Sequence, residues 1–553
     1  MTSLTDVAIA QAHALEPITE IALRAGIPPE ALITFGPHKA KVDITRLGDR
    51  RPQGRLVLVT GMSPTPAGEG KSTVLIGLAD AMTRRGLVAA AALREPSQGP
   101  VMGIKGGAAG GGYSQIVPME DINLHFTGDF HAIAAATNTL AALVDNHVQQ
   151  GNALGIDVRR ITWQRCLDVN DRSLRSVITG LGGTAHGTPR ETGFTITAAS
   201  EIMAVLCLAR DLADLRERLS RLTVAFTFDG QPVTAADLGA TGALAALMKE
   251  AINPNLVQTL GGTPAYVHGG PFANIAHGCN SLIATRVALQ HSDIVLTEAG
   301  FGSDLGAEKF FDIKARHGDL DVAGVVIVAT IRSLKYNGGM ARENLGTESL
   351  EHLREGVRNL ARHVANIQQF GATPIVALNL FTTDTVAERD FLRAWAKDYH
   401  VALEECEVWA RGGEGADALA GVVLDNLGSG SRPLYDPRHG VEASIATIAR
   451  QIYRAEKVEY SPQAVRDLAV LRDNGWDQLP VCISKTQYSF SDEPTALGAP
   501  TGHTLHVREL IPRTGAGFVV VLTGAVMTMP GLPARPAAEG IDLGADGKIS
   551  GLF

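Results

Sequence analysis

One segment of the chain, residues 55–73, restricts its fold more than any other. An apolar run, Arg55-Leu-Val-Leu-Val-Thr60, leads into a loop with Gly68 and Gly70, and Gly-Lys-Ser then opens a stretch with helical periodicity. A glycine-rich loop between a strand and a helix lets backbone N–H groups surround a phosphate, and the helix N-terminus adds partial positive charge. The segment therefore predicts a nucleoside triphosphate site at a strand-to-helix turn.

The residues of this loop have separate expected roles. Lys71 would reach the β- and γ-phosphates of ATP, and the Ser72 hydroxyl would bind Mg²⁺. The usual phosphate-binding loop has glycine where this chain has Thr65, so the loop is a deviant form, as in some ATP-dependent ligases and partitioning ATPases. A plain glycine-rich turn with a surface lysine is the alternative, but it does not explain why strand, loop, Gly-Lys-Ser and helix occur together. The predicted ATP-binding residues are Thr65, Pro66, Ala67, Gly68, Glu69, Gly70, Lys71 and Ser72.

Short apolar runs alternate with longer amphipathic stretches along the chain, which predicts an α/β fold with a mostly parallel sheet. We expect strands at residues 55–60, 88–93, 294–297, 325–330 and 374–378, and helices at 139–149, 199–219 and 350–369. The expected architecture is a large domain like that of the P-loop nucleoside-triphosphate hydrolases, with two smaller α/β domains. Composition shifts place the divisions at 1–345 for the P-loop ATP-binding domain, 346–480 for a second domain and 481–553 for a small C-terminal domain.

Two further segments indicate a site at the carboxyl ends of the strands. The second strand ends in Arg94 and Glu95, which lie near the phosphates if the first two strands are neighbours. A surface ion pair is the alternative for these two residues, and taken alone they favour it. The run Gly103–Tyr113 is rich in glycine and contains Lys105, a composition that suits a backbone wrapped around an anion, with a flexible linker as the alternative.

The composition excludes several classes of protein. The net charge is −9, from 49 Lys and Arg against 58 Asp and Glu, so we expect no general binding of nucleic acid or of an anionic membrane. The five cysteines form no C-x-x-C pair and predict neither a zinc site nor a disulfide framework. The N-terminus lacks a signal-peptide pattern and no apolar run approaches the length of a membrane span, so we expect a cytoplasmic protein. His125, His131, His268 and His277 lack metal-ligand spacing and are expected as hydrogen-bonded residues of the core or of a site wall.

Several longer stretches carry a resemblance to a known family. The chain resembles formate–tetrahydrofolate ligase, also called 10-formyltetrahydrofolate synthetase, over nearly its whole length. The stretches that carry the resemblance are residues 65–72, 94–97, 103–113, 118–131, 168–172, 271–281, 328–339 and 409–415. Small departures occur at Thr192 and Thr195, where acidic residues are expected, and at Tyr336-Asn337, where a Met-His type of pair is common.

The resemblance implies an ATP-dependent reaction in which formate and tetrahydrofolate give 10-formyltetrahydrofolate, ADP and phosphate through formyl phosphate. It makes Lys71 and Arg94 catalytic, with Arg94 holding the phosphate of the intermediate, and assigns Glu95 and Asp129 to a monovalent cation, K⁺ or NH₄⁺. It implies no prosthetic group. It makes residues 346–480 the folate-binding domain, where Phe381 and Trp409 clamp the pterin and Asp384 binds its ring nitrogens. The expected partners are ATP, formate, tetrahydrofolate with or without a polyglutamate tail, and three further copies of the chain in a homotetramer.

Two other classes of function remain open from the residues alone. One is a nucleotide-switch ATPase of the partitioning type, which would be expected to carry a basic patch for DNA or membrane, and the charge of −9 counts against it. The other is a small-molecule kinase that releases a phosphorylated acid. ADP release that requires both formate and tetrahydrofolate would separate the ligase from both alternatives.

Overall fold

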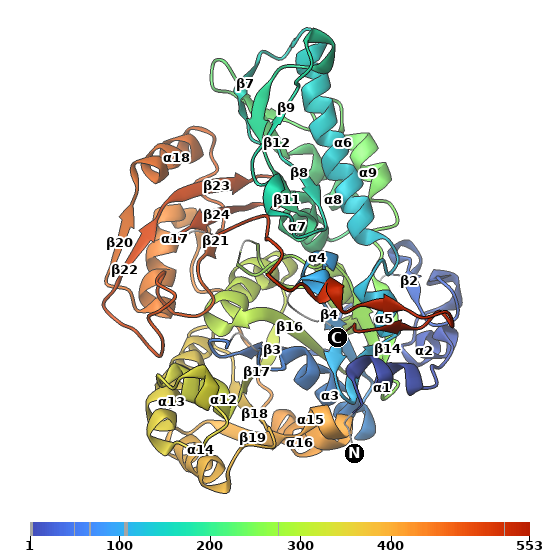
Figure 1. Ribbon diagram of the computed structural model, residues 1–553, viewed down its shortest axis with the longest axis vertical. Helices are drawn as coiled ribbons and strands as arrows, with labels where there is room; N and C mark the ends of the chain where they lie inside the picture. Colours follow the sequence, from blue (N-terminus) through green and yellow to red (C-terminus); the bar gives the residue numbers. More distant parts are fainter. Residues whose placement is uncertain are drawn as a thin grey trace.

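A large central sheet forms the body of the protein. The computed structural model describes residues 4–552 with the exception of residues 49, 66–67, 104–108, 275 and 525. In Figure 1, a helical and stranded extension rises above this sheet, and the C-terminal part of the chain packs beside it. The predicted residues Pro66, Ala67 and Lys105 lie outside the described part of the chain.

The middle of the sheet is parallel, as predicted. Its strand order is β15-β4-β16-β3-β17-β18-β19, and each neighbouring pair in this order is parallel. The bounds are β15 (Pro264–Val267), β4 (Ala89–Leu93), β16 (Ile294–Gly302), β3 (Arg55–Gly61), β17 (Val322–Ala329), β18 (Pro374–Asn379) and β19 (Ala402–Cys406). The five predicted strands all belong to this set, so these predictions are confirmed. Because parallel strands share a direction, their carboxyl ends meet at one edge of the sheet.

Beyond β15, the sheet continues into antiparallel strands. These are β1 (Leu32–Thr34), β2 (Ala40–Val42) and β14 (Asn255–Thr259), of which β14 also pairs with β15 and with β6 (Ser114–Val117).

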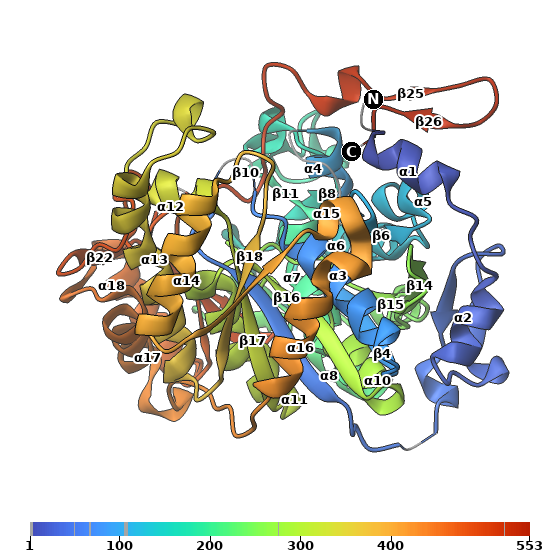
Figure 2. The same ribbon diagram turned by 90° about the horizontal axis from the view of Figure 1, so that it is seen from below.

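Helices cover both faces of the parallel strands, which explains why those strands are continuous apolar runs. Along β3, Leu56 and Leu58 belong to one core cluster, while Val57 and Val59 belong to the other. Figure 2 shows α13 (Leu350–Gln369) and α14 (Val386–Asp398) on one side of β17 and β18, and α3 (Lys71–Arg84) and α16 (Asp417–Asp425) on the other.

The helix that follows the predicted phosphate loop is more deeply buried than its sequence suggests. Val74, Leu75, Leu78, Ala81 and Met82 have the spacing of one apolar face, but all residues from Val74 to Met82 are buried, Asp80 among them. A Cβ atom on Gly77 would lie 2.6 Å from Val408 Cγ1 and 2.7 Å from Ser114 Oγ. The helix is therefore packed on several sides, and only glycine allows the close approach of these neighbours.

The predicted helices are present with different bounds. The helix at 350–369 is confirmed as α13, and the helix at 139–149 is the second half of α6 (Asp129–Gln149). A single helix over 199–219 is wrong: the chain forms α7 (Glu201–Leu208) and α8 (Leu212–Ser220). The break occurs because the Asp211 carboxylate accepts the backbone N–H of Asp214 at 2.8 Å and so caps the start of a new helix.

Smaller sheets lie outside the central one. The extension contains β7 (Ile156–Ile161), β12 (Thr223–Thr227) and β13 (Pro232–Thr234) beside α6 and α9 (Thr241–Leu247). The C-terminal part contains β21 (Val481–Ser484), β24 (Phe518–Leu522) and β23 (Glu509–Arg513), and next to them β20 (Lys457–Tyr460) pairs with β22 (Thr504–Val507). The central sheet takes strands from both sides of residue 345, and the division into three domains stays a prediction.

The C-terminal segment returns to the N-terminal helix. Figure 2 shows the hairpin of β25 (Asp542–Leu543) and β26 (Ile549–Ser550) beside α1 (Asp6–Ala12), and Gln11 Nε2 donates to the Ile549 carbonyl at 2.8 Å. All five cysteines are buried and free. Within the described ranges, no helix has both the length and the apolar character needed to cross a membrane.

Candidate active site

The carboxyl edge of the parallel sheet gathers the residues that the sequence singles out. Arg94 is the first residue after β4, and the loop after β3 leads to Lys71 and Ser72 at the start of α3. Asn379, at the end of β18, is the register partner of Cys406, at the end of β19. Phe381, Asp384 and Trp409 follow these two strands, so they leave the sheet from the same edge as the phosphate loop.

The strand that leads to Lys71, β3, and the strand that leads to Arg94, β4, are not neighbours. The condition under which the sequence places Arg94 near the phosphates, that β3 and β4 are neighbours, is not met, because β16 lies between them. The inserted strand carries Glu298, whose Oε2 accepts a hydrogen bond from Ser72 Oγ at 2.8 Å and whose Oε1 accepts one from Arg94 Nε at 3.1 Å. Glu298 therefore joins the phosphate loop to Arg94 across the intervening strand.

Glu298 joins two predicted parts of the candidate site, and the sequence analysis does not predict it. Its side chain is 1% exposed. Burial alone would raise the pKa of this carboxyl, but the charge of Arg94, hydrogen bonds from Ser72 and Arg94 and the charge of Lys71 outweigh burial and lower the pKa. The carboxylate is thus ionised. An acid directly after the predicted strand at 294–297 is the same signal that marked Arg94, and it could have identified Glu298.

The loop between β3 and α3 depends on glycine at two places. Gly70 has φ 74°, a left-handed conformation, and a Cβ there would lie 2.8 Å from Asn379 Nδ2. A Cβ on Gly61, the last residue of β3, would lie 3.1 Å from Cδ of Lys71. The Lys71 side chain therefore passes directly over the end of β3, toward the edge where ligands bind in parallel sheets.

Thr65 and Glu69 hold the loop together from within. The Glu69 side chain is buried, and its Oε1 accepts the Thr65 backbone N–H at 2.5 Å while its Oε2 accepts the Thr330 hydroxyl at 2.9 Å. Asn379 Nδ2 donates to the Glu69 carbonyl at 3.2 Å. The carboxylate of Glu69 thus fixes the loop against the end of β17, and its backbone carbonyl fixes the loop against the end of β18.

Glu95 and Asp129 lie in a buried cluster with Lys41. Lys41 Nζ lies 2.7 Å from Asp129 Oδ1 and donates to the Asn253 carbonyl at 2.8 Å, and Asn255 Nδ2 donates to Asp129 Oδ2 at 2.8 Å. Glu95 Oε2 is buried without a hydrogen-bond partner among the described residues. Burial, together with the charge of Asp129, raises the pKa of Glu95 well above its usual value. Lys41 supplies one positive charge to the cluster, and one carboxyl oxygen is left for a proton or a cation.

The three residues assigned to the pterin occupy two loops. The Phe381 N–H donates to Asp384 Oδ2 at 2.8 Å, and the Arg332 guanidinium lies 4.5 Å from the centre of the Phe381 ring. Burial raises the pKa of Asp384. Trp409, in α15 (Val408–Arg411), is 45% exposed, which leaves its ring surface open to a ligand.

Trp409 packs against the described end of the glycine run. A Cβ on Gly112 would lie 2.1 Å from the Trp409 carbonyl oxygen, and the Tyr113 N–H donates to that oxygen at 2.8 Å. A Cβ on Gly111 would lie 3.4 Å from Trp409 Cδ1. Glycine at these positions therefore lets the run approach the exposed tryptophan.

The four histidines have different surroundings. His268 is hydrogen-bonded in the core as expected, with Nδ1 2.7 Å from Ser281 Oγ and Nε2 2.6 Å from the Ala251 carbonyl. The expectation of hydrogen bonds is wrong for His277, which is buried but has no partner for either ring nitrogen within the described residues. His125 and His131 are exposed. Across the described ranges, no group of three His, Cys, Asp or Glu side chains is arranged to hold a metal ion.

A strained residue marks the same edge of the sheet. Phe301, near the end of β16, has φ 61°, which is uncommon for a bulky side chain. Such strain persists where the surrounding structure enforces it and concentrates at functional sites. Sequence patterns give no sign of this conformation, because Phe301 stands in an ordinary Gly-Phe-Gly sequence.

The fold and the site together define an α/β enzyme with a polar ligand site at the carboxyl edge of its parallel sheet. Residues 4–553 match the family model described as formate–tetrahydrofolate ligase. The chain belongs to the formate–tetrahydrofolate ligase family, which confirms the resemblance and argues against a partitioning ATPase and a simple kinase.

Proteins named formate–tetrahydrofolate ligase align with nearly the whole chain. The one from Corynebacterium diphtheriae is 69% identical over 550 residues, which cover 99% of this chain and 100% of that protein. The one from Corynebacterium jeikeium is 67% identical over 561 residues, covering 99% and 98%. The one from Staphylococcus aureus is 56% identical over 555 residues, covering 100% of both.

The bridge made by Glu298 can be tested by its effect on stability. We expect Glu298→Gln to lower the free energy of unfolding by about 2 kcal/mol, because the amide keeps the shape but leaves the Arg94 guanidinium without its charged partner. Urea denaturation of Glu298→Gln, Arg94→Met and the double variant measures the coupling. Additive losses would show that the two side chains do not stabilise each other in solution.

Proposed function

We propose that the chain joins formate to tetrahydrofolate at the expense of ATP and gives 10-formyltetrahydrofolate, ADP and phosphate. The observation that carries the proposal is the full-length match to the formate–tetrahydrofolate ligase family. The arrangement of Lys71, Ser72 and Arg94 around one ionised carboxylate supports it, since a phosphoryl group needs several cationic and hydrogen-bonding groups in one place.

The proposed reaction has two steps, because the oxygen of formate is a poor leaving group. In the first step a formate oxygen attacks the γ-phosphorus of ATP, the bond to the bridging oxygen breaks, and ADP leaves. In the second step N10 of tetrahydrofolate attacks the carbon of formyl phosphate, phosphate leaves with the bonding electrons, and N10 loses its proton. The enzyme must therefore hold the same phosphate in both steps.

Lys71 and Ser72 suit the first step. Lys71 is the first residue of α3, directly after the loop, and the helix dipole favours anions at this end of the helix. Ser72 donates a hydrogen bond to Glu298, so the lone pairs of its oxygen remain available as ligands, and Mg²⁺ prefers oxygen ligands. Ser72 would hold Mg²⁺, which when bound neutralises charge on the phosphates.

Arg94 suits the second step. Its Nε is held by Glu298, and no hydrogen bond to its two terminal nitrogens occurs within the described residues. A Cβ on Gly300 would lie 3.0 Å from one of those nitrogens, so glycine keeps that side of the guanidinium clear. With Nε on Glu298, the two terminal nitrogens of this planar guanidinium can bind the phosphate of formyl phosphate in a bidentate manner, which a lysine cannot do.

Arg94→Ser tests the proposed reaction and the role of Arg94 together. We expect kcat for formate- and tetrahydrofolate-dependent ADP formation to fall by about 10²–10³, the scale of a lost transition-state donor. ATP should still bind, because Lys71 and Ser72 remain. Calorimetric ATP binding and steady-state rates on the same preparation decide the point.

Lys71→Met is the matched control for that experiment, and it should weaken ATP binding as well as turnover. If Arg94→Ser loses ATP affinity as steeply as rate, Arg94 binds the nucleotide and not the intermediate. A wild-type protein that forms ADP without both formate and tetrahydrofolate would contradict the proposed function itself.

The folate is proposed to bind over the loops that follow β18 and β19. Trp409 offers an exposed indole ring and Phe381 a second aromatic ring. Asp384, which precedes α14, offers a carboxyl for the polar edge of the pterin. These assignments rest on the resemblance and on the common origin of both loops at one edge of the sheet. Residues 346–480, which contain them, are the proposed folate-binding region.

Trp409→Ala tests the folate site. We expect the KM for tetrahydrofolate to rise about fivefold, because stacking of one aromatic pair contributes about 1 kcal/mol, while the KM for ATP stays the same. Trp409→Phe should recover most of the loss. Trp395→Ala is a control for loss of an aromatic ring, since Trp395 stacks on Tyr399 in α14 and should leave both KM values unchanged. A larger rise in the KM for ATP would assign Trp409 to the nucleotide.

Glu95 and Asp129 are proposed to hold K⁺ or NH₄⁺. The buried Glu95 oxygen, which has no partner among the described residues, fits such a role, although Lys41 already balances one of the two carboxylates. A bound cation would supply the remaining positive charge and favour the ionised form of Glu95 over the protonated one.

The cation proposal predicts a pH-dependent stabilisation. Because folding raises the pKa of Glu95, the stability that comes from its protonated form is present at low pH and is lost as pH rises through the folded-state pKa. K⁺ should offset that loss, so the thermal midpoint in KCl should exceed that in NaCl by more at pH 9 than at pH 6. At tenfold excess over its Kd the cation would contribute about 1.4 kcal/mol. Glu95→Gln should remove the difference, and equal midpoints in K⁺, NH₄⁺ and Na⁺ would contradict the site.

Three further expectations from the sequence stay proposals. They are the division at residues 345 and 480, a homotetramer, and a location in the cytoplasm. Limited proteolysis, light scattering and fractionation of cells would test them in turn.

A further inference from the structure

The first residue of the phosphate loop with a polar side chain, Ser63, is held on every polar atom. Its backbone N–H donates to His363 Nε2 at 2.8 Å, and its hydroxyl oxygen accepts a hydrogen bond from Asn359 Nδ2 at 3.0 Å. Its carbonyl accepts one from Asn337 Nδ2 at 3.2 Å. These three partners are 0–5% exposed, so water does not compete for the contacts.

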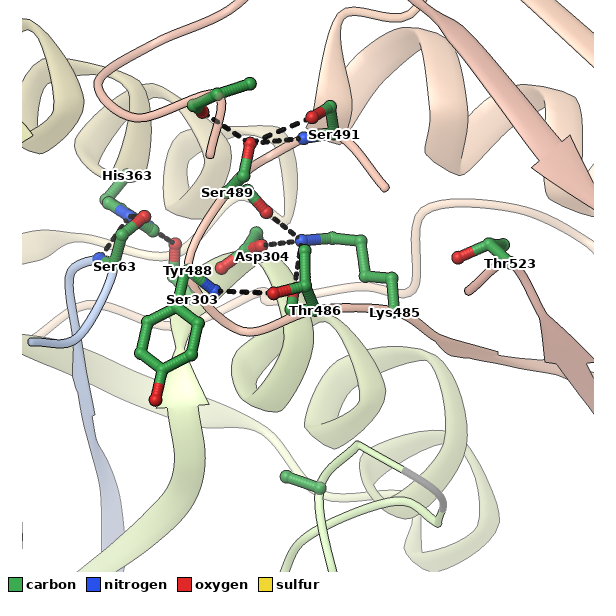
Figure 3. Close-up of polar contacts among 12 residues, drawn as sticks. Ser63, Ser303, Asp304, His363, Lys485, Thr486, Tyr488, Ser489, Ser491 and Thr523 are labelled. Carbon is green, nitrogen blue, oxygen red and sulfur yellow. Dashed lines mark hydrogen bonds and ion pairs between the residues drawn. The ribbon is translucent and has the colours of Figure 1, made fainter. Parts of the chain in front are cut away.

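The hydrogen bonds determine which form of His363 is present. A backbone N–H can only donate, so Nε2 accepts and carries no proton. Nδ1 then carries the proton and donates to Ser303 Oγ, 2.7 Å away. Burial lowers the pKa of His363 to about 4, which agrees with a neutral ring. Figure 3 shows the imidazole between the two serines.

The two serines lie just after two neighbouring strands of the parallel sheet. Ser63 follows β3 and leads into the loop of Lys71 and Ser72, and Ser303 follows β16, which carries Glu298. A Cβ on Gly302 would lie 3.1 Å from His363 Cε1 and 2.6 Å from Asp304 Oδ1, so the approach of His363 to β16 requires glycine there. His363 thus spans the same pair of strands as the Ser72–Glu298 hydrogen bond, on the side of α13.

A C-terminal segment, residues 485–498, closes over His363. Phe490 is fully buried, and its ring centre lies 4.7 Å from that of His363. Gly498 accepts from Asn359 Nδ2 at 2.6 Å through its carbonyl and donates to Asn337 Oδ1 at 3.4 Å through its N–H. The two asparagines that hold Ser63 therefore also hold this segment.

A buried ion pair fastens the same segment beside Ser303. Lys485 Nζ donates to Asp304 Oδ2 at 2.7 Å, and both side chains are 0–1% exposed (Figure 3). The ammonium also donates to the carbonyls of Thr486 and Ser489. With its charge paired and its remaining donors used, Lys485 fits a structural role and not one of contact with substrate.

We propose that His363 is a positioning residue for the phosphate loop: as a neutral hydrogen-bond bridge it fixes the backbone of Ser63 relative to Ser303, and residues 485–498 hold it in place. The proposal rests on the proposed function, because it assigns the loop to ATP. The proposal also includes Asn337, one of the residues at which the sequence differs from the pattern expected for the family. Its amide donates to the Ser63 carbonyl and accepts the Gly498 N–H.

Two substitutions separate the Ser63 contact from the Ser303 contact. The amide of His363→Asn lies near Nδ1 and can still donate to Ser303, but it does not reach Ser63. The amide oxygen of His363→Gln lies near Nε2 and can accept the Ser63 N–H. We expect His363→Asn to weaken ATP binding and lower kcat about tenfold each, since small misplacements of a catalytic loop are costly, with the KM for tetrahydrofolate unchanged. His363→Gln should recover most of both losses.

Val364→Ala is the control for a general loss of packing. Val364 is the next residue of α13 and is fully buried, so its truncation should lower the thermal midpoint and leave ATP binding unchanged. Wild-type ATP affinity in His363→Asn would overturn the proposal. So would a loss of ATP affinity in Val364→Ala as large as that in His363→Asn. Should His363→Asn fail to fold, Ser303→Ala removes the other partner of the ring and should shift ATP affinity in the same direction, and unchanged affinity there would also overturn it.

The readouts keep the two proposals apart. Calorimetric ATP binding tests the position of the loop and does not depend on the chemical reaction. Formation of 10-formyltetrahydrofolate by the wild-type protein tests the proposed function. A wild-type protein that binds ATP in a His363-dependent manner without forming that product would contradict the function alone.

Discussion

Glu298 carries a negative charge in the middle of the central sheet, with 1% of its side chain exposed. A hydrogen bond from Ser72 and an ion pair with Arg94 stabilise that charge. An unpaired carboxylate at this depth would take up a proton, because the loss of hydration costs several kcal/mol. The pairing keeps it ionised. Since the partners come from β4 and from the start of α3, the same contacts fix two separate parts of the site relative to β16. The geometry of the site therefore exists before any substrate binds.

A second connection between β3 and β16 lies on the other side of the loop, and it uses no charge. His363 joins Ser63 to Ser303 through two neutral hydrogen bonds, one on each ring nitrogen. The two connections differ in what they can do for a ligand. The contacts of Glu298 place the cationic groups of Arg94 and Lys71 at the edge of the sheet. The contacts of His363 restrain the loop without adding a charge that would attract or repel a phosphate. Together they constrain the loop at both of its ends.

Much of the fold could be predicted from the sequence because its signals are local. Buried parallel strands are continuous apolar runs, and all five predicted strands lie in the central sheet. The order of the strands could not be predicted, because β16 lies some 200 residues beyond β4 in the chain and nothing local shows that it inserts beside it. Glu298 directly follows a predicted strand, as Arg94 does, but only the strand order shows that it lies between Arg94 and the loop of Lys71 and Ser72.

The other differences have local physical causes that compete with periodicity. The stretch 199–219 keeps a helical pattern, but the cap made by Asp211 divides it. His363 stands on an amphipathic helix, where a histidine usually marks the polar face. Its role appears only once Ser63, Ser303 and Phe490 are brought around it from three distant segments. Sequence can show which residue types are available, and the tertiary structure decides which of their atoms are already in use.

That distinction explains why an arginine serves at position 94. A guanidinium has donors on three nitrogens in one plane, so Nε can bind Glu298 while the terminal nitrogens, which have no hydrogen bond among the described residues, can bind a second group. A lysine in the same place could not bind both the buried carboxylate and a phosphate, because its single ammonium cannot contact both groups in a fixed geometry. Arginine can therefore combine a fixed anchor with donors for a second group, which suits the proposed binding of one phosphate through two successive steps.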